Sequence, residues 1–289
     1  MTNTVEEYLS HNYSDVFIII TCSVIEDVIE QLNAIHFFDN SEAAVADFIL
    51  FKSRKKKEMN RNYPETFRLT KQQCIPKKIH YCWFGGHPIP EKYTNWMSSW
   101  RKYCPDYEII EWNERNYDVS KSTFMLESYK AQKWGFVTDY VRLDVIYNHG
   151  GIYLDTDVEL IKPLDELLFQ DAFSGVEANN LVASGLGFGA IKGHKMIYEL
   201  LNYYTDKHFD SYNTSAVPVA TKNIYKKHGY IENGEYQVIN GMTIYPEKVL
   251  AGKDQYTGII APTEHTFAIH HYDASWCDEK IKENVKTIR

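Results

Sequence analysis

Two apolar patterns alternate along the chain and predict an α/β protein. Residues 16–20 (Val-Phe-Ile-Ile-Ile) form a continuous β-branched run that is typical of a buried strand. A helix is predicted directly after this run, with Ser23 as its N-cap and apolar residues at helical spacing. Polar and weakly periodic sequence follows. We therefore predict an N-terminal α/β extension over residues 1–73, joined to a main domain over residues 74–289.

The main domain begins with a strand, a helix and a second strand, which the pattern predicts over residues 78–84, 91–103 and 107–112. This order indicates neighbouring parallel strands in an α/β sheet. Residues 134–151 have apolar residues at helical spacing and end on a glycine pair, which is a strong helix stop. A short buried strand is predicted directly afterwards, over residues 152–154.

The composition is that of an ordinary globular protein, with 44% hydrophobic and 24% charged residues. A formal charge of −8 argues against general nucleic-acid binding, which needs a basic face. No apolar run approaches the ~20 residues of a membrane-spanning helix, and Met1 to Ser10 lack the features of a secretory signal. The five cysteines include no Cys-x-x-Cys pair, so neither a disulfide framework nor a zinc site is indicated. We expect a reduced, cytoplasmic protein.

The strongest candidate for chemistry is Asp155-Thr156-Asp157. The apolar strand before it delivers both carboxylates to the carboxyl end of the strand, where open α/β sheets bind their ligands. Two like charges this close repel each other unless a cation lies beside them. Hard oxygen ligands suit Mg²⁺ or Mn²⁺ shared with the phosphates of a substrate. The alternative interpretation is a solvated exit from the strand into a loop.

Two further pairs are polar residues in otherwise apolar segments. Asp139 and Arg142 are three residues apart and so share one face of the predicted helix. They form either a structural ion pair or a polar patch that binds ligand hydroxyls.

His270 and His271 follow a strand-like segment near the C-terminus. They are either a surface pair or the source of an imidazole ligand for the carboxylate site, which would favour Mn²⁺ over Mg²⁺.

Gly185 to Ala190 (GLGFGA) matches the G-x-G-x-x-A fingerprint of dinucleotide sites. That fingerprint belongs to a strand–turn–helix unit with an acidic residue about twenty positions later, where Asp206 is the nearest fit. The alternating glycines favour instead a strand that a ligand approaches closely. We therefore do not predict a nicotinamide or flavin site.

Three blocks in a fixed order resemble a known family: residues 75–86 (IPKKIHYCWFGG), 138–142 (TDYVR) and 150–157 (GGIYLDTD). They resemble the glycosyltransferases with a DXD sugar-binding region, family 32, which includes bacterial capsular-polysaccharide enzymes and the yeast initiating mannosyltransferase. The same blocks are similar to the catalytic domain of the large glucosylating toxins. The resemblance runs from about Cys74 to Trp276 and does not clearly cover residues 1–73.

The resemblance implies a GT-A fold with a mixed central sheet, a Mn²⁺ or Mg²⁺ cofactor, and retention of the anomeric configuration. It implies two catalytic carboxylates, with Asp157 binding the metal directly and Asp155 contacting the ribose or a metal-bound water. His270 is the expected third metal ligand, and His271 is the alternative one residue away. The resemblance also implies donor-binding residues, namely Trp83 on the nucleobase, Asp139 and Arg142 on the sugar hydroxyls, Tyr153 in the nucleotide pocket, and Ser275 and Trp276 on the diphosphate.

The function that this implies is a metal-dependent retaining glycosyltransferase. It would move a hexose from UDP-galactose or UDP-glucose, before GDP-mannose, to an oligosaccharide or lipid-linked glycan in capsular or surface polysaccharide synthesis. One alternative is a haloacid-dehalogenase-like phosphatase, whose Asp-x-Asp motif has Thr or Val where this chain has Glu159. The other is a non-catalytic carbohydrate-binding protein with a relic site.

Three roles stay open for residues 1–73: packing on the catalytic domain, a homodimer contact, or reception of the acceptor. The basic run at residues 52–57 (KSRKKK) has two interpretations. It is either a solvated segment or a peripheral contact with anionic lipids at the inner membrane face.

Overall fold

The computed structural model describes residues 18–20, 43–45, 62–210, 216–255 and 258–273. The larger of its two compact units spans Arg61–Cys277. In the other unit the described residues are two parallel strands, β1 (Ile18–Ile20) and β2 (Ala43–Val45). The strand predicted over 16–20 is thus present at its described positions. The helix predicted after Ser23 and the basic run at 52–57 lie outside the described residues.

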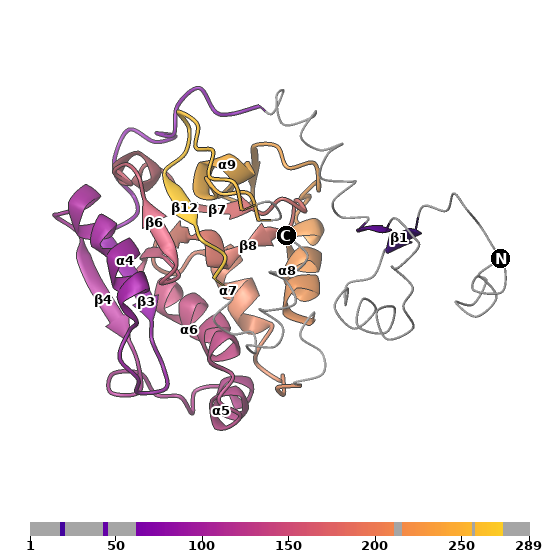
Figure 1. The fold of residues 1–289 in the computed structure, drawn as a ribbon. Helices are drawn as coiled ribbons and strands as arrows, with labels where there is room; N and C mark the ends of the chain where they lie inside the picture. The colour runs from indigo at the N-terminus through magenta and orange to yellow at the C-terminus, as the bar shows by residue number, and fades with distance from the viewer. Residues whose placement is uncertain (1–17, 21–42, 46–61, 211–215, 256–257, 274–289) are drawn as a thin grey trace. The chain divides into compact units, whose positions relative to one another are not determined.

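A mixed central sheet organises the larger unit (Figure 1). Its order is β10-β11-β7-β9-β5-β3-β4, and β8 pairs with β7. The strands are β3 (Lys78–Cys82), β4 (Glu108–Trp112), β5 (Gly151–Tyr153), β7 (Ala172–Val176), β8 (Val182–Ala183), β9 (Phe188–Ala190), β10 (Gln237–Ile239) and β11 (Met242–Tyr245). The predicted α/β class with a mixed sheet is confirmed.

The strand directions bring several carboxyl ends to one edge of the sheet. β3 runs parallel to β4 and β5, and β7 runs parallel to β11. β9 lies antiparallel between β5 and β7, so these two strands also share a direction. The residues that follow β3, β4, β5, β7 and β11 therefore emerge at the same edge, which is where ligands bind in open α/β sheets.

A second, two-stranded sheet joins distant parts of the sequence. β6 (Val158–Leu160) pairs antiparallel with β12 (Ala268–His270), and the two strands lie side by side in Figure 1. In this register Val158 is opposite His270. The C-terminal histidine is thereby placed beside the residue that follows Asp157.

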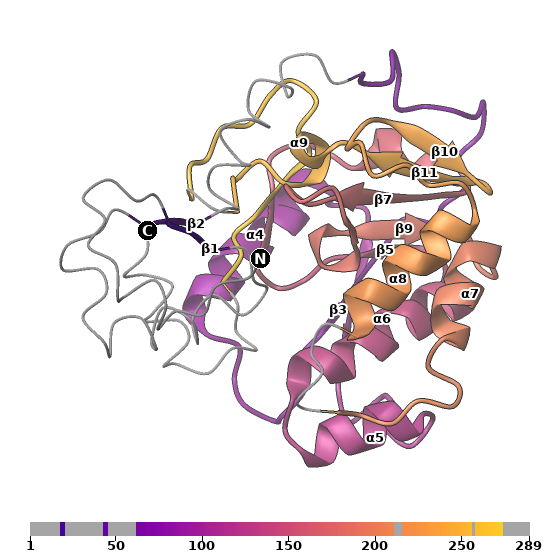
Figure 2. The same cartoon turned by 90° about the vertical axis from the view of Figure 1, so that its right-hand side faces the viewer.

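Helices cover both faces of the central sheet. Figure 2 shows α6, α7 and α8 side by side on one face. The trace of α4 lies on the other face, where Trp100 joins the second hydrophobic cluster. Among the described residues the helices are α4 (Glu91–Tyr103), α5 (Thr123–Lys130), α6 (Trp134–His149), α7 (Lys195–Asn202), α8 (Ala216–Lys227) and α9 (Glu247–Leu250), with 3₁₀ turns η2 (Asp165–Leu168) and η3 (Ser184–Leu186). None of the helices in this described part has the length and apolar character needed to cross a bilayer.

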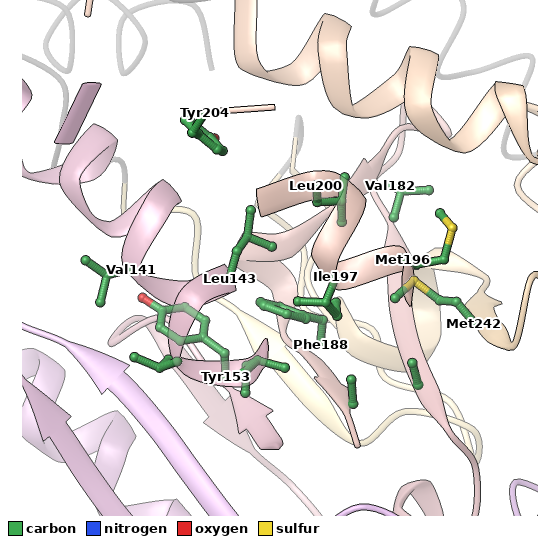
Figure 3. Packing of buried hydrophobic residues seen from close by; sticks show 14 of the residues in the cluster. Val141, Leu143, Tyr153, Val182, Phe188, Met196, Ile197, Leu200, Tyr204 and Met242 are labelled. Atoms are coloured by element: carbon green, nitrogen blue, oxygen red, sulfur yellow. The ribbon is translucent and has the colours of Figure 1, made fainter. Parts of the chain in front are cut away.

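The hydrophobic core is divided between the two faces because successive strand residues point to opposite sides. On β5, Tyr153 packs into the cluster formed with α6 and α7, whereas Ile152 packs into the cluster that contains Trp100 of α4. Figure 3 shows the first cluster, in which Phe188 of β9 lies beside Ile197 of α7. The sheet is therefore buried on both sides, which explains the continuous apolar character of its strands.

Two glycines set the connection between α6 and β5. Gly150 has φ +65° and ends α6, and Gly151 has φ +112° and begins β5. A Cβ on Gly151 would lie 2.9 Å from the Cβ of Lys78 on the neighbouring strand β3. Larger residues do not fit this turn, so the glycine pair fixes where β5 starts and hence where Asp155 emerges.

Residues 62–73 pack with the larger unit, so the boundary predicted at residue 73 moves towards residue 61. Phe67 is 7% exposed, and its ring centroid lies 4.9 Å from that of Phe267 and 5.3 Å from that of Tyr245. The amide of Leu69 donates to the carbonyl of Phe169 at 2.9 Å. Periodicity did not reveal this packing because a single buried aromatic in an irregular segment leaves no repeating pattern.

We expect Phe67→Ala to destabilise the protein by about 3–5 kcal/mol, because it removes a ring buried among aromatic side chains. The control is Leu69→Ala, since Leu69 is 40% exposed and its truncation removes little buried area. The measurement is chemical denaturation followed by tryptophan fluorescence. Equal, small changes in both variants would show that residues 62–73 do not belong to this core.

Candidate functional site

Asp155 and Asp157 emerge from β5 at the shared edge of the sheet. The amide of Leu154 donates to the carbonyl of His80 at 3.0 Å, which extends the pairing of β5 with β3 beyond Tyr153. A tight turn follows, in which the amide of Val158 donates to the carbonyl of Asp155 at 3.1 Å. This turn holds both carboxylates between β5 and β6, so their positions are set by two sheets.

His270 joins these two carboxylates. One possible ligand atom from each of Asp155, Asp157 and His270 lies within 4.8 Å of the others. The Nε2 atom of His270 is 3.4 Å from Oδ1 of Asp157. Two carboxylates and one imidazole are a donor set that suits Mn²⁺, and also Mg²⁺ with further oxygen ligands. The residues present therefore fit the divalent cation that the sequence predicted.

The neighbouring histidine is directed elsewhere. His271 Nε2 lies 2.9 Å from Oε2 of Glu159, and its ring stacks on Trp96 with centroids 4.0 Å apart. Residues next to each other on an extended segment point to opposite sides, so only one of the two histidines can face the carboxylates. The structure brings His270 into the site, and His271 packs against α4.

Arg142 pairs with both Asp139 and Asp155. Its Nη2 atom is 3.4 Å from Oδ1 of Asp139 and 3.5 Å from Oδ1 of Asp155. The same guanidinium donates to the carbonyl and the hydroxyl of Thr138 at 3.1 Å and 2.9 Å, and to Oγ of Ser184 at 3.3 Å. Arg142 is only 6% exposed. The pair predicted at Asp139 and Arg142 is thus an ion-pair network that includes Asp155.

The charges of this network perturb one another. Burial raises the pKa of Asp139 to about 6, although Arg142 opposes the shift. Burial also raises the pKa of Asp155. Arg142 opposes this increase, and the negative charge of Asp157 adds to it. Burial acts against the charged form of Arg142, but Asp155, Tyr153 and Asp139 outweigh it and raise the pKa of the guanidinium. One buried cation therefore serves two carboxylates.

The buried ring of Tyr153 lies next to the guanidinium of Arg142. It is 1% exposed, and the guanidinium carbon of Arg142 lies 5.1 Å from its ring centroid. Burial holds the pKa of its phenol well above the usual range. The sequence predicted that Tyr153 lines the nucleotide pocket. In the structure it lies beneath the site, because β5 turns this side chain towards α6 and α7.

Trp83 lines a cavity of about 1000 Å³ at the carboxyl ends of β3 and β4. Its indole Nε1 donates to the carbonyl of His87 at 2.6 Å, which fixes the ring orientation. Asn113, Glu114 and Trp134 are among the other lining residues. The predicted aromatic residue is therefore available to a ligand beside the strand that delivers Asp155. Ser275 and Trp276, the other predicted donor-binding residues, lie outside the described part of the chain.

Gly185 lies beside the acidic site. The glycine run therefore has a different role from that in the dinucleotide fingerprint. A Cβ at Gly185 would lie 2.9 Å from Oδ2 of Asp155 and 3.9 Å from Nε2 of His270. The run forms the 3₁₀ turn η3 followed by strand β9, and not a strand–turn–helix unit. The sequence predicted close approach by a ligand. In the structure the groups that approach Gly185 are the protein's own Asp155, Arg142 and His270.

Glu177 is a carboxylate near this site that the sequence analysis did not single out. It directly follows β7, so it emerges at the same sheet edge as Asp155. Burial raises its pKa, and the positive field of His270 opposes that shift. The only sequence signal was its place one residue beyond a buried strand, and strand ends carry many acidic residues. Only the strand order shows that β7 and β5 share an edge.

A comparison with protein families agrees with this geometry. Residues 90–174, which include Asp139, Arg142, Asp155 and Asp157, match the model of the family described as "Glycosyltransferase sugar-binding region containing DXD motif". This segment of the chain is similar to the DXD glycosyltransferases. Its Asp155-Thr156-Asp157 is the DXD motif within the matched segment.

Curated proteins that are similar to this chain include two proteins of Schizosaccharomyces pombe. Inositol phosphoceramide mannosyltransferase 1 is 29% identical over 154 residues, which cover 48% of this chain and 47% of that protein. Inositol phosphoceramide mannosyltransferase 3 is 32% identical over 138 residues, which cover 44% and 36%. The chain thus spans less than half the length of these two relatives. Among solved structures, the PaToxG glycosyltransferase has a TM-score of 0.42 and 18% identity, covering 62% of this chain and 79% of that chain.

We expect the stability of the protein to depend on Asp139 between about pH 4 and pH 6. A carboxyl whose pKa is raised from 3.8 to about 6 holds its proton more tightly in the folded state, so the folded state loses stability as the pH rises through this window. Asp139→Asn removes this dependence, which amounts to about 3 kcal/mol at ~1.4 kcal/mol per pKa unit. Urea denaturation of both proteins across this range measures the difference. Parallel pH profiles would contradict the assignment.

We expect Gly185→Ala to weaken divalent-cation binding by at least about tenfold, because the new methyl group displaces the Asp155 carboxylate. Calorimetric titration with Mn²⁺ measures this change. Gly193→Ala is the control: Gly193 has φ +75° and open space around its Cβ position. That variant should lose some stability and keep its affinity for Mn²⁺. Equal affinities in the two variants would show that the space beside Asp155 is not needed.

Proposed function

We propose that this protein is a metal-dependent glycosyltransferase that transfers a hexose from a nucleoside-diphosphate sugar with retention of configuration. The observation that carries the proposal is the convergence of Asp155, Asp157 and His270 after β5, at the same sheet edge as the cavity that Trp83 lines after the neighbouring strand β3. A nucleoside diphosphate needs both features, since its base is apolar and flat and its phosphates are strongly negative. The family match supports the proposal independently of this geometry.

The chain's own residues would divide the work of binding. Asp155, Asp157 and His270 would hold Mn²⁺ or Mg²⁺, and the cation would supply positive charge for the leaving diphosphate. Trp83 would stack on the nucleobase. Asp139 would accept hydrogen bonds from donor-sugar hydroxyls. Arg142, whose donors already serve Thr138, Ser184 and the two acids, would hold Asp139 and Asp155 in place and contact the donor only secondarily.

Transfer breaks the bond between the anomeric carbon and the diphosphate oxygen and forms a bond from that carbon to an acceptor oxygen. We propose that the acceptor attacks on the face from which the diphosphate leaves. The acceptor hydroxyl would then give its proton to the leaving phosphate, so charges and atoms balance without a protein nucleophile. A double displacement would instead need a carboxylate ~3 Å from the anomeric carbon on the opposite face.

The sequence favoured UDP-galactose or UDP-glucose over GDP-mannose. Because the relatives described above are named as mannosyltransferases, we add a mannosyl donor with equal weight. For the acceptor we propose an oligosaccharide or a lipid-linked glycan, reached from the cytoplasmic face of a membrane. The names of the relatives, which refer to a phosphoceramide lipid, support an amphiphilic acceptor. A role in capsular or surface polysaccharide synthesis remains part of this proposal.

A screen of nucleotide sugars tests the function. The purified protein is incubated with UDP-galactose, UDP-glucose, UDP-N-acetylglucosamine and GDP-mannose, with Mn²⁺ or with a chelator, and release of the nucleoside diphosphate is measured. We expect Mn²⁺-dependent hydrolysis of one donor and an α-configured product from an α-configured donor by NMR. Asp157→Asn should lower the rate by at least about a thousandfold, because it removes a direct metal ligand.

Asp206→Asn is the matched control, since Asp206 is exposed and does not belong to the cluster of possible metal ligands. It should retain the full rate, and both variants should unfold at the temperature of the unmodified protein. Near-normal turnover by Asp157→Asn would refute the proposed metal site. Hydrolysis of a generic aryl phosphate, with no donor hydrolysed, would favour a phosphatase. Binding of a donor that is insensitive to Mn²⁺ would favour a relic site.

A further inference from the structure

The segment after β12 is fastened to the first turn of α4. Two residues of α4 hold the carboxylate of Asp273: Lys92 Nζ lies 2.6 Å from Oδ2 and 2.8 Å from Oδ1, and the hydroxyl of Tyr93 donates to Oδ2. We call Lys92, Tyr93 and Asp273 the α4 clamp. The clamp joins residues 181 and 180 positions apart in the sequence. An anionic group at this end of α4 is also favoured by the helix dipole.

The clamp reaches the proposed metal site through the backbone of Asp273. The amide of Asp273 donates to Oδ2 of Asp157 at 3.0 Å. The amide of His271 donates to the carbonyl of Asp157 at 2.9 Å, so the same segment binds this aspartate at both its side chain and its main chain. The segment also carries His270, whose imidazole is 3.4 Å from the other carboxylate oxygen of Asp157. The orientation of two proposed ligands therefore depends on where this segment lies.

His271 and Lys253 fix the rest of the segment. The ring of His271 is held between Trp96 of α4 and Glu159 of β6. Lys253 Nζ donates to the carbonyl of His271 at 2.6 Å. Tyr272, between His271 and Asp273, has φ +52°, a backbone conformation that non-glycine residues rarely adopt. The chain makes a sharp turn here, and such a turn persists when contacts on both sides hold it.

We propose that Asp273 and Tyr93 are positioning residues of the metal site, which hold His270 and Asp157 in the geometry that binds a divalent cation. This inference rests on the proposed function and adds residues that the DXD motif does not contain. Neither residue belongs to the cluster of possible metal ligands. They act through the segment 270–273, whose anchor on α4 prevents it from moving away from β5 and β6.

The two partners of Asp273 contribute unequally. The Lys92 side chain is 51% exposed, and an exposed ion pair contributes little because water and salt screen it. Tyr93 is 4% exposed, so its hydroxyl loses water on folding and needs its acceptor. The Tyr93 hydrogen bond is therefore the main anchor of the clamp. Tyr93 also contacts Trp83, with ring centroids 5.7 Å apart, so the clamp adjoins the cavity as well.

The test measures Mn²⁺ binding to the full-length protein without any donor, by the loss of the free Mn²⁺ signal in electron paramagnetic resonance. The variants are Tyr93→Phe, Asp273→Asn and Lys92→Met. Tyr103→Phe, at the other end of α4, is the matched control. Loss of a residue that orients metal ligands typically weakens metal affinity by about 10–100-fold. We expect this weakening for Tyr93→Phe and Asp273→Asn, a change of less than about threefold for Lys92→Met, and none for Tyr103→Phe.

A second readout separates positioning from general damage to the fold. All three ligands remain in these variants, so saturating Mn²⁺ should restore kcat for donor hydrolysis to near its original value, while the Mn²⁺ concentration for half-maximal rate rises. Thermal unfolding without metal should stay close to that of Tyr103→Phe. Unchanged Mn²⁺ affinity in Tyr93→Phe and Asp273→Asn would overturn the inference. A weakened affinity that saturating Mn²⁺ cannot rescue would also overturn it.

The same experiment distinguishes this inference from the proposed function. If the unmodified protein binds no Mn²⁺ and Asp157→Asn changes nothing, the proposed metal site itself is wrong. If the unmodified protein binds Mn²⁺, Asp157→Asn abolishes binding and the clamp variants bind normally, only the role of the clamp is wrong.

Discussion

The site depends on the burial of one positive charge. Arg142 is buried, with Asp139 and Asp155 within 3.5 Å of its Nη2 atom and the ring centroid of Tyr153 5.1 Å from its guanidinium carbon. Removing one partner of such a buried pair typically costs about 3–5 kcal/mol, because the other charge is left without compensation. Without this cation, Asp155 would take up a proton or turn towards water. The acidic site can therefore exist at the sheet edge only because α6 carries an arginine into the core.

The topology explains why chemistry gathers at that edge. β9 is inserted antiparallel between β5 and β7, and this keeps β5 and β7 parallel, with their carboxyl ends together. The small sheet of β6 and β12 then brings a segment from the end of the described chain to the residue after Asp157. Two segments distant in sequence, the turn between β5 and β6 and the end of β12, thus supply one carboxylate–imidazole cluster. The lack of a side chain at Gly185 leaves room for this cluster, because a Cβ there would lie 2.9 Å from Oδ2 of Asp155.

The same architecture accounts for the unequal roles of neighbouring residues. His270 and His271 are adjacent in sequence, yet one faces Asp157 and the other stacks on Trp96. Tyr153 and Asp155 are two residues apart, yet one is in the core and the other is at the site. For the two histidines, the alternation of an extended chain sets opposite directions. Tyr153 and Asp155 differ instead because β5 ends at Tyr153, so Tyr153 is buried within the sheet and Asp155 lies in the turn beyond it. Asp273, beyond both histidines, fastens this segment to α4.

The sequence by itself determined the local elements. The helix predicted over 91–103 matches α4 residue for residue, and the helix predicted from residue 134 to the glycine pair corresponds to α6, because their apolar spacing and stop signals are encoded within a few turns. The sequence also identified the Asp-x-Asp motif, and the three ordered blocks pointed to its family. The family resemblance already favoured His270 over His271, and the structure adds the contacts of each side chain. The inward position of Tyr153 and the approach of Gly185 and Glu177 to the site came only from the tertiary structure. Periodicity reports hydrogen bonding and burial within one element, whereas these features arise where separate strands are paired and separate charges are brought together.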